Sequence, residues 1–350
     1  MMALETLWFW LVAALLTGYV VLDGFDLGMG AVYLFLGRTD RERRRLLQSI
    51  GPVWDANEVW LLAAGGSLVL AFPKLYASSF SGFYLPLMMV LWLLILRAVA
   101  IEFRSHLDSA VWRPFWDVVF SLASLLLAVF LGAALGNVVR GVPLAADGYF
   151  FNPLWTNFLT TGERIGILDW YTVMVGVTSL VALVHHGTLW ASLKTDGVVQ
   201  ERARWMAARA WWLLLALVLG LTAITFRVQP HVAGRLAAHP VGYIFPLLAL
   251  AGLGASRWMD LRRRELPAFL GSAVFLAGML LSVSFGLFPM VLPAVNQGVA
   301  SLTVHNAAAP ASGLRTALFW WIPGMILVVG YTTFIYRNMA GKVVQDADGY

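Results

Sequence analysis

The chain has 350 residues, of which 60% are hydrophobic and only 12% are charged, whereas roughly a quarter of the residues in soluble domains are charged. This composition excludes a water-soluble protein, and the absence of cysteine excludes disulfides, thiolate metal sites and thiol nucleophiles. Lys and Arg outnumber Asp and Glu by 24 to 19, but the basic residues form blocks between long apolar runs, which indicates membrane topology and not a nucleic-acid partner.

Apolar runs of about 20 residues are long enough to cross a bilayer as helices. About nine such runs follow one another along the chain, with polar breaks between them. They predict an all-α polytopic membrane protein that forms a single integral-membrane domain over residues 1–350. The predicted spans cover about residues 5–36, 51–71, 81–103, 115–137, 167–190, 210–228, 241–258, 267–288 and 316–336.

The distribution of Lys and Arg between the loops predicts the orientation of the spans. One set of alternate loops, together with the C-terminal tail, holds 17 of these residues, and the other set holds 6. Because basic residues accumulate on the cytoplasmic side of a membrane, we expect the N-terminus outside and the C-terminus inside the cell.

Five ionisable residues stand out inside the first three predicted spans: Asp23, Asp26, Asp55, Glu58 and Arg97. Each costs roughly 3 kcal/mol at the centre of a membrane helix and is therefore a functional candidate by default. The acids come in pairs three residues apart, so each pair lies near one face of its helix. At 1.5 Å per residue, Asp26, Asp55 and Arg97 lie about 18, 15 and 10 Å from the nearest basic loop, which places the cluster in the inner half of the membrane. Four acids beside one base predict carboxylates that are protonated or in contact with water, as a proton-conducting cluster requires.

Structural explanations compete with this one. Asp23 and Asp26 lie in a segment whose Gly24 and Gly28 favour close helix packing, so capping, pairing with Arg97 or bonding to a neighbouring backbone explains them equally well. For the second pair of acids we favour a functional role, because one arginine cannot neutralise both and spare buried acids are costly.

The chain offers no metal site and no catalytic residues of its own. His185 and His186 are adjacent near the inner end of a predicted span, and adjacent helical residues point in different directions, so we expect interfacial or hydrogen-bonding roles for them. No span carries a His pair or a His/Met pattern that would hold a haem within this chain alone.

The segments around the buried charges resemble subunit II of the cytochrome bd family of quinol oxidases. The most specific of them contains Trp54-Asp55-Ala56-Asn57-Glu58-Val59-Trp60, in which the family usually has Gly in place of Ala56. The segments that carry the resemblance are Leu22 to Gly28, Gly51 to Leu61, Tyr84 to Leu87, Leu96 to Arg104, His186 to Thr188 and Lys194 to Gly197.

This resemblance implies a fold of two four-helix bundles and one peripheral helix, with helices 1–4 over about residues 5–137, helices 5–8 over about 167–288 and helix 9 over about 316–336. It also implies a bacterial inner-membrane complex that couples quinol oxidation to the reduction of dioxygen to water and generates proton motive force. In such complexes haem b and haem d are bound mainly by a partner, subunit I. Small single-helix accessory subunits and membrane lipids are further partners compatible with the resemblance.

The resemblance also implies roles for residues at matching positions. Asp55 and Glu58 would belong to a proton route from the inside, and Trp60 would lie beside a dioxygen route. The remaining residues would support the haem site or the packing of the subunits: Trp54, Asn57, Asp23, Asp26 and Arg97.

Two other functions remain open from the residues. A standalone proton-coupled transporter would need acids near the membrane midplane on interrupted helices, but here the acids cluster in the first three spans, with no matching cluster in the later ones. A purely structural assembly subunit would need the acids for complex formation and not for turnover.

Overall fold

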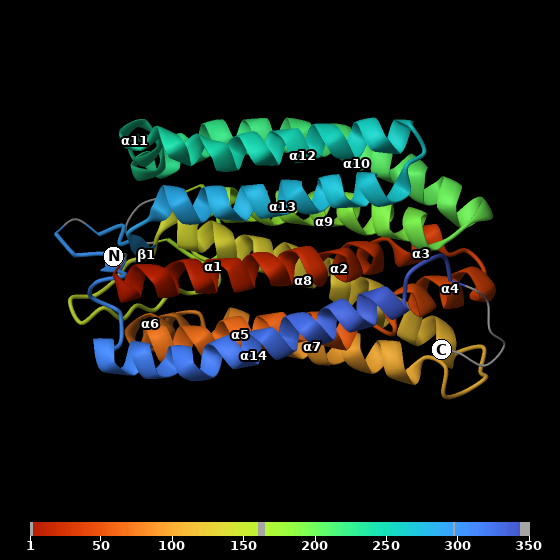
Figure 1. Ribbon diagram of the computed structural model, residues 1–350, viewed down its shortest axis with the longest axis horizontal. Coiled ribbons are helices and arrows are strands. Elements are labelled where there is room, and N and C mark those ends of the chain that lie inside the picture. The colour runs from red at the N-terminus through yellow and green to blue at the C-terminus, as the bar shows by residue number, and fades with distance from the viewer. Residues whose placement is uncertain (1–2, 160–164, 297, 344–350) are drawn as a thin grey trace.

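Long helices run side by side along one direction of the molecule (Figure 1). The computed structural model describes residues 3–159, 165–296 and 298–343. Over these residues the elements are α1 (Leu4–Leu22), α2 (Gly24–Ala31), α3 (Tyr33–Leu36), α4 (Asp40–Ile50), α5 (Trp54–Ala71), α6 (Pro73–Gly82), α7 (Tyr84–Phe103), α8 (Trp112–Arg140), α9 (Trp170–Lys194), α10 (Gly197–Val228), α11 (Pro230–Ala238), η1 (Pro240–Tyr243), α12 (Ile244–Leu261), α13 (Glu265–Leu287), β1 (Met290–Leu292), β2 (Leu302–Thr303) and α14 (Ala311–Asn338).

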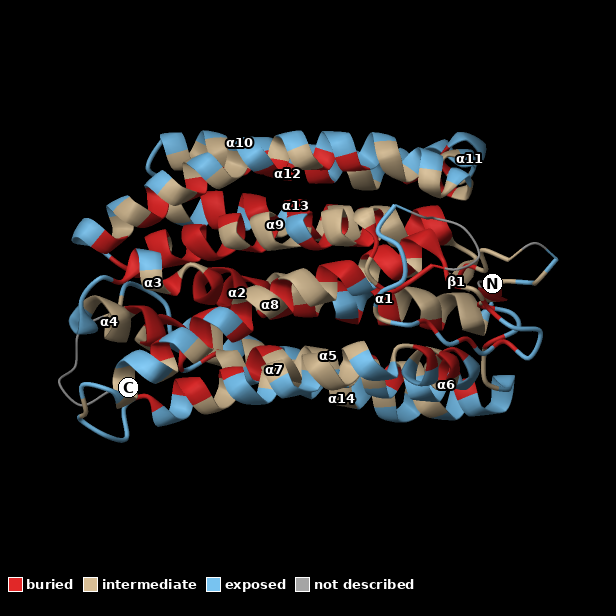
Figure 2. Cartoon of the chain, turned by 180° about the vertical axis from the view of Figure 1, so that it is seen from behind, coloured by how far each residue is buried: buried red, intermediate tan, exposed pale blue. Residues whose placement is uncertain are grey.

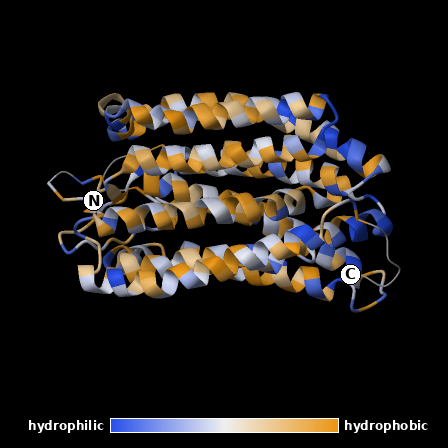
Figure 3. Ribbon diagram, viewed as in Figure 1, coloured by the Kyte–Doolittle hydropathy of each residue, from blue (hydrophilic) through white to orange (hydrophobic). Residues whose placement is uncertain are grey.

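The predicted all-α membrane architecture is confirmed. Within the described ranges, eight helical segments are long and apolar enough to span a bilayer, and there are up to nine if the bent pair α5–α6 is one span. The start of α1 and the end of α14 lie at opposite ends of the helices (Figure 1). Hydrophilic residues gather at the end that carries α4 and the C-terminal end of α14, called the basic end below (Figure 3).

The second predicted span is shorter than expected and sharply bent at its end. The helix begins at Trp54 and ends at Ala71, and α6 then leaves it at 118°. Pro73 explains the bend, because the residue before a proline is pushed out of the helical region, and Phe72 accordingly has φ −133° and ψ 64°. Pro73 itself is well suited to the first turn of α6.

The first predicted span is divided into three helices. Asp23 ends α1 and precedes α2, although its peptide N–H still bonds to the Tyr19 carbonyl oxygen at 2.8 Å. Val32, with φ −110° and ψ 13°, separates α2 from α3. The chain is therefore irregular at the position of the first buried acid, which a hydropathy pattern alone does not reveal.

The helices form two packed groups with one helix outside them. The first group contains α1–α3, α5, α7 and α8, and the second contains α9, α10, α12 and α13. The groups meet where α9 packs against α2 and α8 and where α1 packs against α13, while α14 lies against α5 and α1. This arrangement agrees with two bundles and a peripheral helix.

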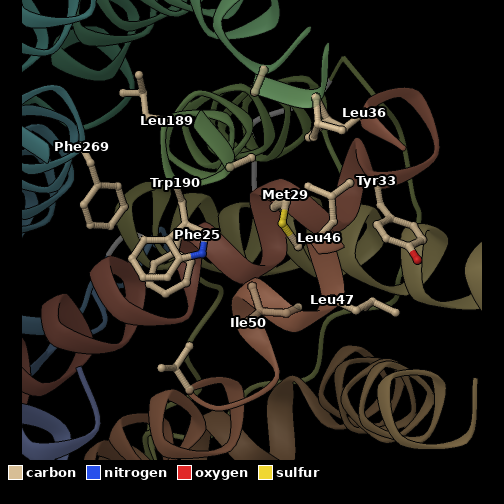
Figure 4. Packing of buried hydrophobic residues seen from close by; sticks show 14 of the residues in the cluster. Phe25, Met29, Tyr33, Leu36, Leu46, Leu47, Ile50, Leu189, Trp190 and Phe269 are labelled. Atoms are coloured by element: carbon tan, nitrogen blue, oxygen red, sulfur yellow. The ribbon is translucent and has the colours of Figure 1, made fainter. Parts of the chain in front are cut away.

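Buried residues concentrate on the helices between the two groups, whereas α7, α10, α12 and α14 expose much of their surface (Figure 2). The apolar core near the basic end includes Phe25 of α2 stacked on Trp190 of α9, with ring centroids 4.1 Å apart (Figure 4). At the opposite end, the loop before α14 contains the short antiparallel strands β1 and β2, which pair Met290 with Thr303 and Leu292 with Leu302.

Candidate functional site

A cluster of buried polar side chains lies where α5 and α7 face the junction of α1 and α2. Asp23, Asn57 and Arg97 are fully buried, and Asp26 is 1% exposed. Glu58 is partly buried, with 23% of its side chain accessible. The structure therefore brings together four of the five predicted intramembrane charges.

Arg97 of α7 is the centre of the ionic part of the cluster. Its two terminal nitrogens donate hydrogen bonds of 3.0 and 2.7 Å to the two carboxylate oxygens of Asp23. Oε1 of Glu58 lies 3.0 Å from the same guanidinium, but this contact is an ion pair without hydrogen-bond geometry, so the oxygen has no hydrogen-bond partner. Of the alternatives open for Asp23, pairing with Arg97 is the one observed.

Asp26 belongs to a second set of contacts, in which its partners are the neutral side chains of Asn57 and, beyond it, Tyr336. The side-chain amide of Asn57 donates to Oδ2 of Asp26 at 2.8 Å, and the Tyr336 hydroxyl on α14 donates to the amide oxygen of Asn57 at 2.8 Å. The other oxygen of Asp26 is buried without a hydrogen-bond partner. These hydrogen bonds link α2, α5 and the peripheral helix α14. The sequence did not predict the role of Tyr336, because it does not indicate which helices α14 contacts.

Asp55 is exposed on the surface of the protein, so of the four predicted intramembrane acids it is the one that the structure does not bring into the buried cluster. The reason is the start of α5 at Trp54: Asp55 falls in the first turn of the helix, and Glu58 lies one turn deeper. The two acids nevertheless share a helix face that leads from the surface to Arg97.

The two tryptophans near these acids pack differently. Trp54 is half-buried against the core near the basic end. The Trp60 ring covers Gly18 of α1 so closely that a Cβ at that glycine would lie 2.4 Å from the ring. Its indole N–H donates to Thr332 of α14 at 3.4 Å. Trp60 therefore occupies the space where α1, α5 and α14 meet.

A second ionic cluster near the basic end was missed from the sequence. Buried Asp117 of α8 accepts hydrogen bonds from Arg104 at 2.6 Å, Arg43 at 2.9 Å and the Tyr33 hydroxyl at 2.9 Å. Arg104 also donates to Asp40 at 2.7 Å. Asp117 lies inside the predicted span 115–137, and an acid within an apolar run is the feature of the sequence that could have indicated this cluster.

Neighbouring arginines also shift the pKa of Asp40, which lies outside the membrane spans in the first turn of α4. Burial raises its pKa, but the hydrogen bond from Arg104 and the positive charges of Arg104, Arg113 and Arg44 outweigh this effect, so the pKa lies below its usual value. The cluster thus fastens α4 and the end of α7 to α8.

Both buried histidines are hydrogen-bonded inside the protein. His185 donates to the Ala207 carbonyl at 3.1 Å and shares a 3.0 Å hydrogen bond with the Ser256 hydroxyl. His186 donates to the Val21 carbonyl at 3.0 Å and shares a 2.7 Å hydrogen bond with Ser272. The two rings point towards different helices, as expected. In the described part of the chain, both nitrogens of each ring are hydrogen-bonded, so neither ring has a nitrogen available to bind a haem iron.

Comparison with known proteins gives full-length matches. Relatives include the cytochrome bd ubiquinol oxidase subunit 2 of Bacillus subtilis, 32% identical over 97% of both chains. The probable cytochrome oxidase subunit 2 of Haemophilus influenzae is 31% identical over 97% of this chain and 95% of its own. The cytochrome bd-I ubiquinol oxidase subunit 2 of Escherichia coli K12 is 29% identical over 98% of this chain and 96% of its own.

The fold has a solved counterpart in a chain of the bd oxidase from Geobacillus thermodenitrificans, with a TM-score of 0.77 and 19% identity over 97% of this chain and 99% of that one. The family model described as cytochrome bd terminal oxidase subunit II matches residues 4–339. The long helices, the buried polar cluster on the first three spans and these matches agree, and the chain belongs to the cytochrome bd terminal oxidase subunit II family.

Proposed function

We propose that this chain supports a haem-bearing subunit I in a quinol oxidase that reduces dioxygen to water, and that it has no catalytic residues of its own. Its relatives from E. coli and B. subtilis are named as ubiquinol oxidase subunits. The hydrogen bonds at both ring nitrogens of His185 and His186 support a placement of haem b and haem d in the partner. Quinol would be oxidised in the partner as well.

The proposed contribution of this chain is a proton route along α5. Asp55 would receive protons at the surface, and Glu58 would pass them on beside Arg97. The observation that carries this proposal is the incomplete pairing of Glu58: Arg97 already holds Asp23 with two hydrogen bonds, while Glu58 has only an ion pair and remains partly accessible. A carboxylate whose charge is only partly compensated can gain and lose a proton at lower cost than Asp23.

Other residues would hold this route in place or serve dioxygen. Arg97, Asp23, Asp26 and Asn57 would fix α2, α5 and α7 relative to one another. Trp60 would line an apolar path for dioxygen, because its ring fills the junction of three helices. Trp54 would position the start of α5 against the core.

The family and the apolar helices make the chain a multi-pass protein of the bacterial inner membrane. We propose that the basic end faces the cytoplasm, which places the N-terminus outside and the C-terminus inside. We further propose that subunit I, any single-helix accessory subunits and membrane lipids cover the apolar side chains that α7 and α14 expose, such as Trp92 and Phe319.

The proton route can be tested with Glu58→Gln in the assembled oxidase. Quinol oxidase turnover per haem d is expected to fall about tenfold or more, since loss of a proton-transfer group usually costs at least that much, while the haem spectrum stays unchanged because Arg97 keeps Asp23. Asp260→Asn is the matched control, since Asp260 is a partly buried acid of α12 paired with Arg257. Full turnover of Glu58→Gln at every pH would refute the route.

The turnover assay and a second assay in liposomes separate the alternatives. A purely structural role predicts a lower yield of complex with normal turnover per haem. A standalone transporter predicts substrate-dependent proton uptake by this chain alone in liposomes; family membership favours the oxidase subunit.

A further inference from the structure

A cavity of about 540 Å³ lies at the basic end between α3 and the first half of α10. The charged cluster at Arg97 does not contribute to it. Its walls are largely apolar and include Leu34 and Phe35 on one side and Val198, Trp205 and Met206 on the other. Phe35, Val198 and Trp205 are 67%, 62% and 55% exposed, so the cavity is open to the surroundings of the protein.

The depth of this cavity in the membrane follows from the length of α10. A helix of 32 residues is about 48 Å long, whereas the hydrocarbon core is about 30 Å thick. The apolar stretch of α10 covers about residues 210–228, so its first turns extend into the headgroup region. Phe35 lies at the end of the first span, and Trp205 is of the residue type enriched at membrane interfaces. The cavity therefore crosses from headgroups to acyl chains.

The charges around the cavity favour an anion. Glu201 is paired with Arg263 at 2.9 Å, and Arg202 is paired with Glu42 at 2.7 Å, so these two residues add little net charge. The Arg38 side chain borders the cavity, and the Arg209 guanidinium lies 3.5 Å from the ring centre of Trp205. Among the described residues, neither Arg38 nor Arg209 forms a salt bridge with an acid, which leaves two uncompensated positive charges.

We propose that this cavity binds one anionic phospholipid, with its phosphate between Arg38 and Arg209 and an acyl chain along Phe35 and Trp205. Apolar walls that include Phe35 and Trp205, with one arginine in the lining and another stacked on Trp205, match the two chemical halves of such a lipid. A zwitterionic lipid carries a cation of its own and gains less from these arginines. The site is a contact of the subunit with the leaflet at the basic end and is independent of the proton route.

Photolabelling of the assembled oxidase can locate the lipid. The complex is placed in phosphatidylcholine nanodiscs that contain a small fraction of phosphatidylglycerol with a photoreactive acyl chain, and the labelled peptides are identified by mass spectrometry. We expect labelling of the segments 34–38 and 198–206. The same photoreactive group on phosphatidylcholine is expected to label these segments no more than the exposed apolar face of α12.

Variants then test the charges. Arg38→Gln is expected to lower phosphatidylglycerol labelling about fivefold, the effect of one basic residue near an anionic lipid, and Arg209→Gln provides a second variant. Arg264→Gln, which removes another exposed arginine at the basic end away from the cavity, should leave labelling unchanged. Haem spectra confirm assembly of each variant.

Three results would overturn the proposal. One is equal labelling by the two lipids, and another is unchanged labelling in both Arg38→Gln and Arg209→Gln. The third is loss of labelling when inorganic phosphate is added, because this would identify a site for the free ion and not for a lipid.

Discussion

Arg97 binds Asp23 through two parallel hydrogen bonds of 3.0 and 2.7 Å, and both side chains are completely buried. This bidentate pair joins α7 to the junction between α1 and α2. Because it satisfies both oxygens of Asp23, the second acid beside Arg97, Glu58, is left with a weaker contact. The geometry thus distinguishes a structural acid from an acid suited to proton exchange.

Replacement of Arg97 should show how much the bidentate geometry contributes. Arg97→Leu leaves Asp23 buried without its partner, which typically costs about 3 to 5 kcal/mol, so we expect loss of assembled complex. Arg97→Lys keeps the charge but cannot form two parallel bonds, and we expect a complex with a lower melting temperature. Fluorescence-detected size exclusion before and after heating measures both effects. An Arg97→Leu complex as stable as wild type would show that the pair contributes nothing.

The contact between Tyr336 and Asn57 should control the position of Asp26. Tyr336→Phe removes the hydroxyl that donates to Asn57, and we expect a loss of about 1 kcal/mol of stability together with reduced turnover, because Asn57 is then free to turn away from Asp26. Thermal unfolding and quinol oxidase assays are the measurements. Tyr331→Phe, at an exposed tyrosine on the same helix, is the control and should match wild type; equal behaviour of the two variants would contradict the role of Tyr336.

Close packing between α2 and α9 should make Gly28 intolerant of any side chain. A Cβ there would lie 1.7 Å from the Leu183 carbonyl oxygen, which is backbone and cannot rotate away. We expect Gly28→Ala to reduce the yield of folded complex strongly, since overpacking typically costs about 1 to 3 kcal/mol and more where backbone must move. Gly254→Ala is the control in a helix with open space at the Cβ position, and its yield should equal or exceed that of wild type.

The start of α4 should lose stability in acid. Burial raises the pKa of Glu42, but hydrogen bonds from Arg202 and from the backbone of Arg38 and Thr39 outweigh this, so the pKa lies below its usual value of 4.5. The stabilisation by ionised Glu42 is therefore complete above that value and is lost as the pH falls through the lower pKa of the folded state.

Melting temperatures of wild type and Glu42→Gln complexes should accordingly differ above the usual pKa of 4.5 and converge as the pH is lowered through the depressed pKa of folded Glu42. The exposed ion pair of Glu201 with Arg263 provides the control, because Glu201→Gln should change the melting temperature little over the same pH range. A constant difference between wild type and Glu42→Gln across this range would show that ionisation of Glu42 does not matter.

Helix number and membrane character could be predicted from the sequence, because spans of apolar residues are a local property of the chain. The end of α5 is an intermediate case, because Pro73 marks a break in the sequence but does not give the 118° angle at which α6 leaves. The interruption at Asp23 gave no hydropathy signal, because Leu22 before it and Phe25 after it continue the apolar run.

The buried charges of the first three helices were also identifiable from the sequence, since an ionisable residue in an apolar run is conspicuous. Only the tertiary structure shows which partners these side chains have. Arg97 binds Asp23, and Asp26 accepts a hydrogen bond from Asn57, which is itself bound by Tyr336. Asp55 is exposed, and Asp117 binds Arg43 and Arg104. These features depend on how far each helix is rotated about its axis and shifted along it. Such relations between helices arise from packing of all side chains together, and no single segment encodes them.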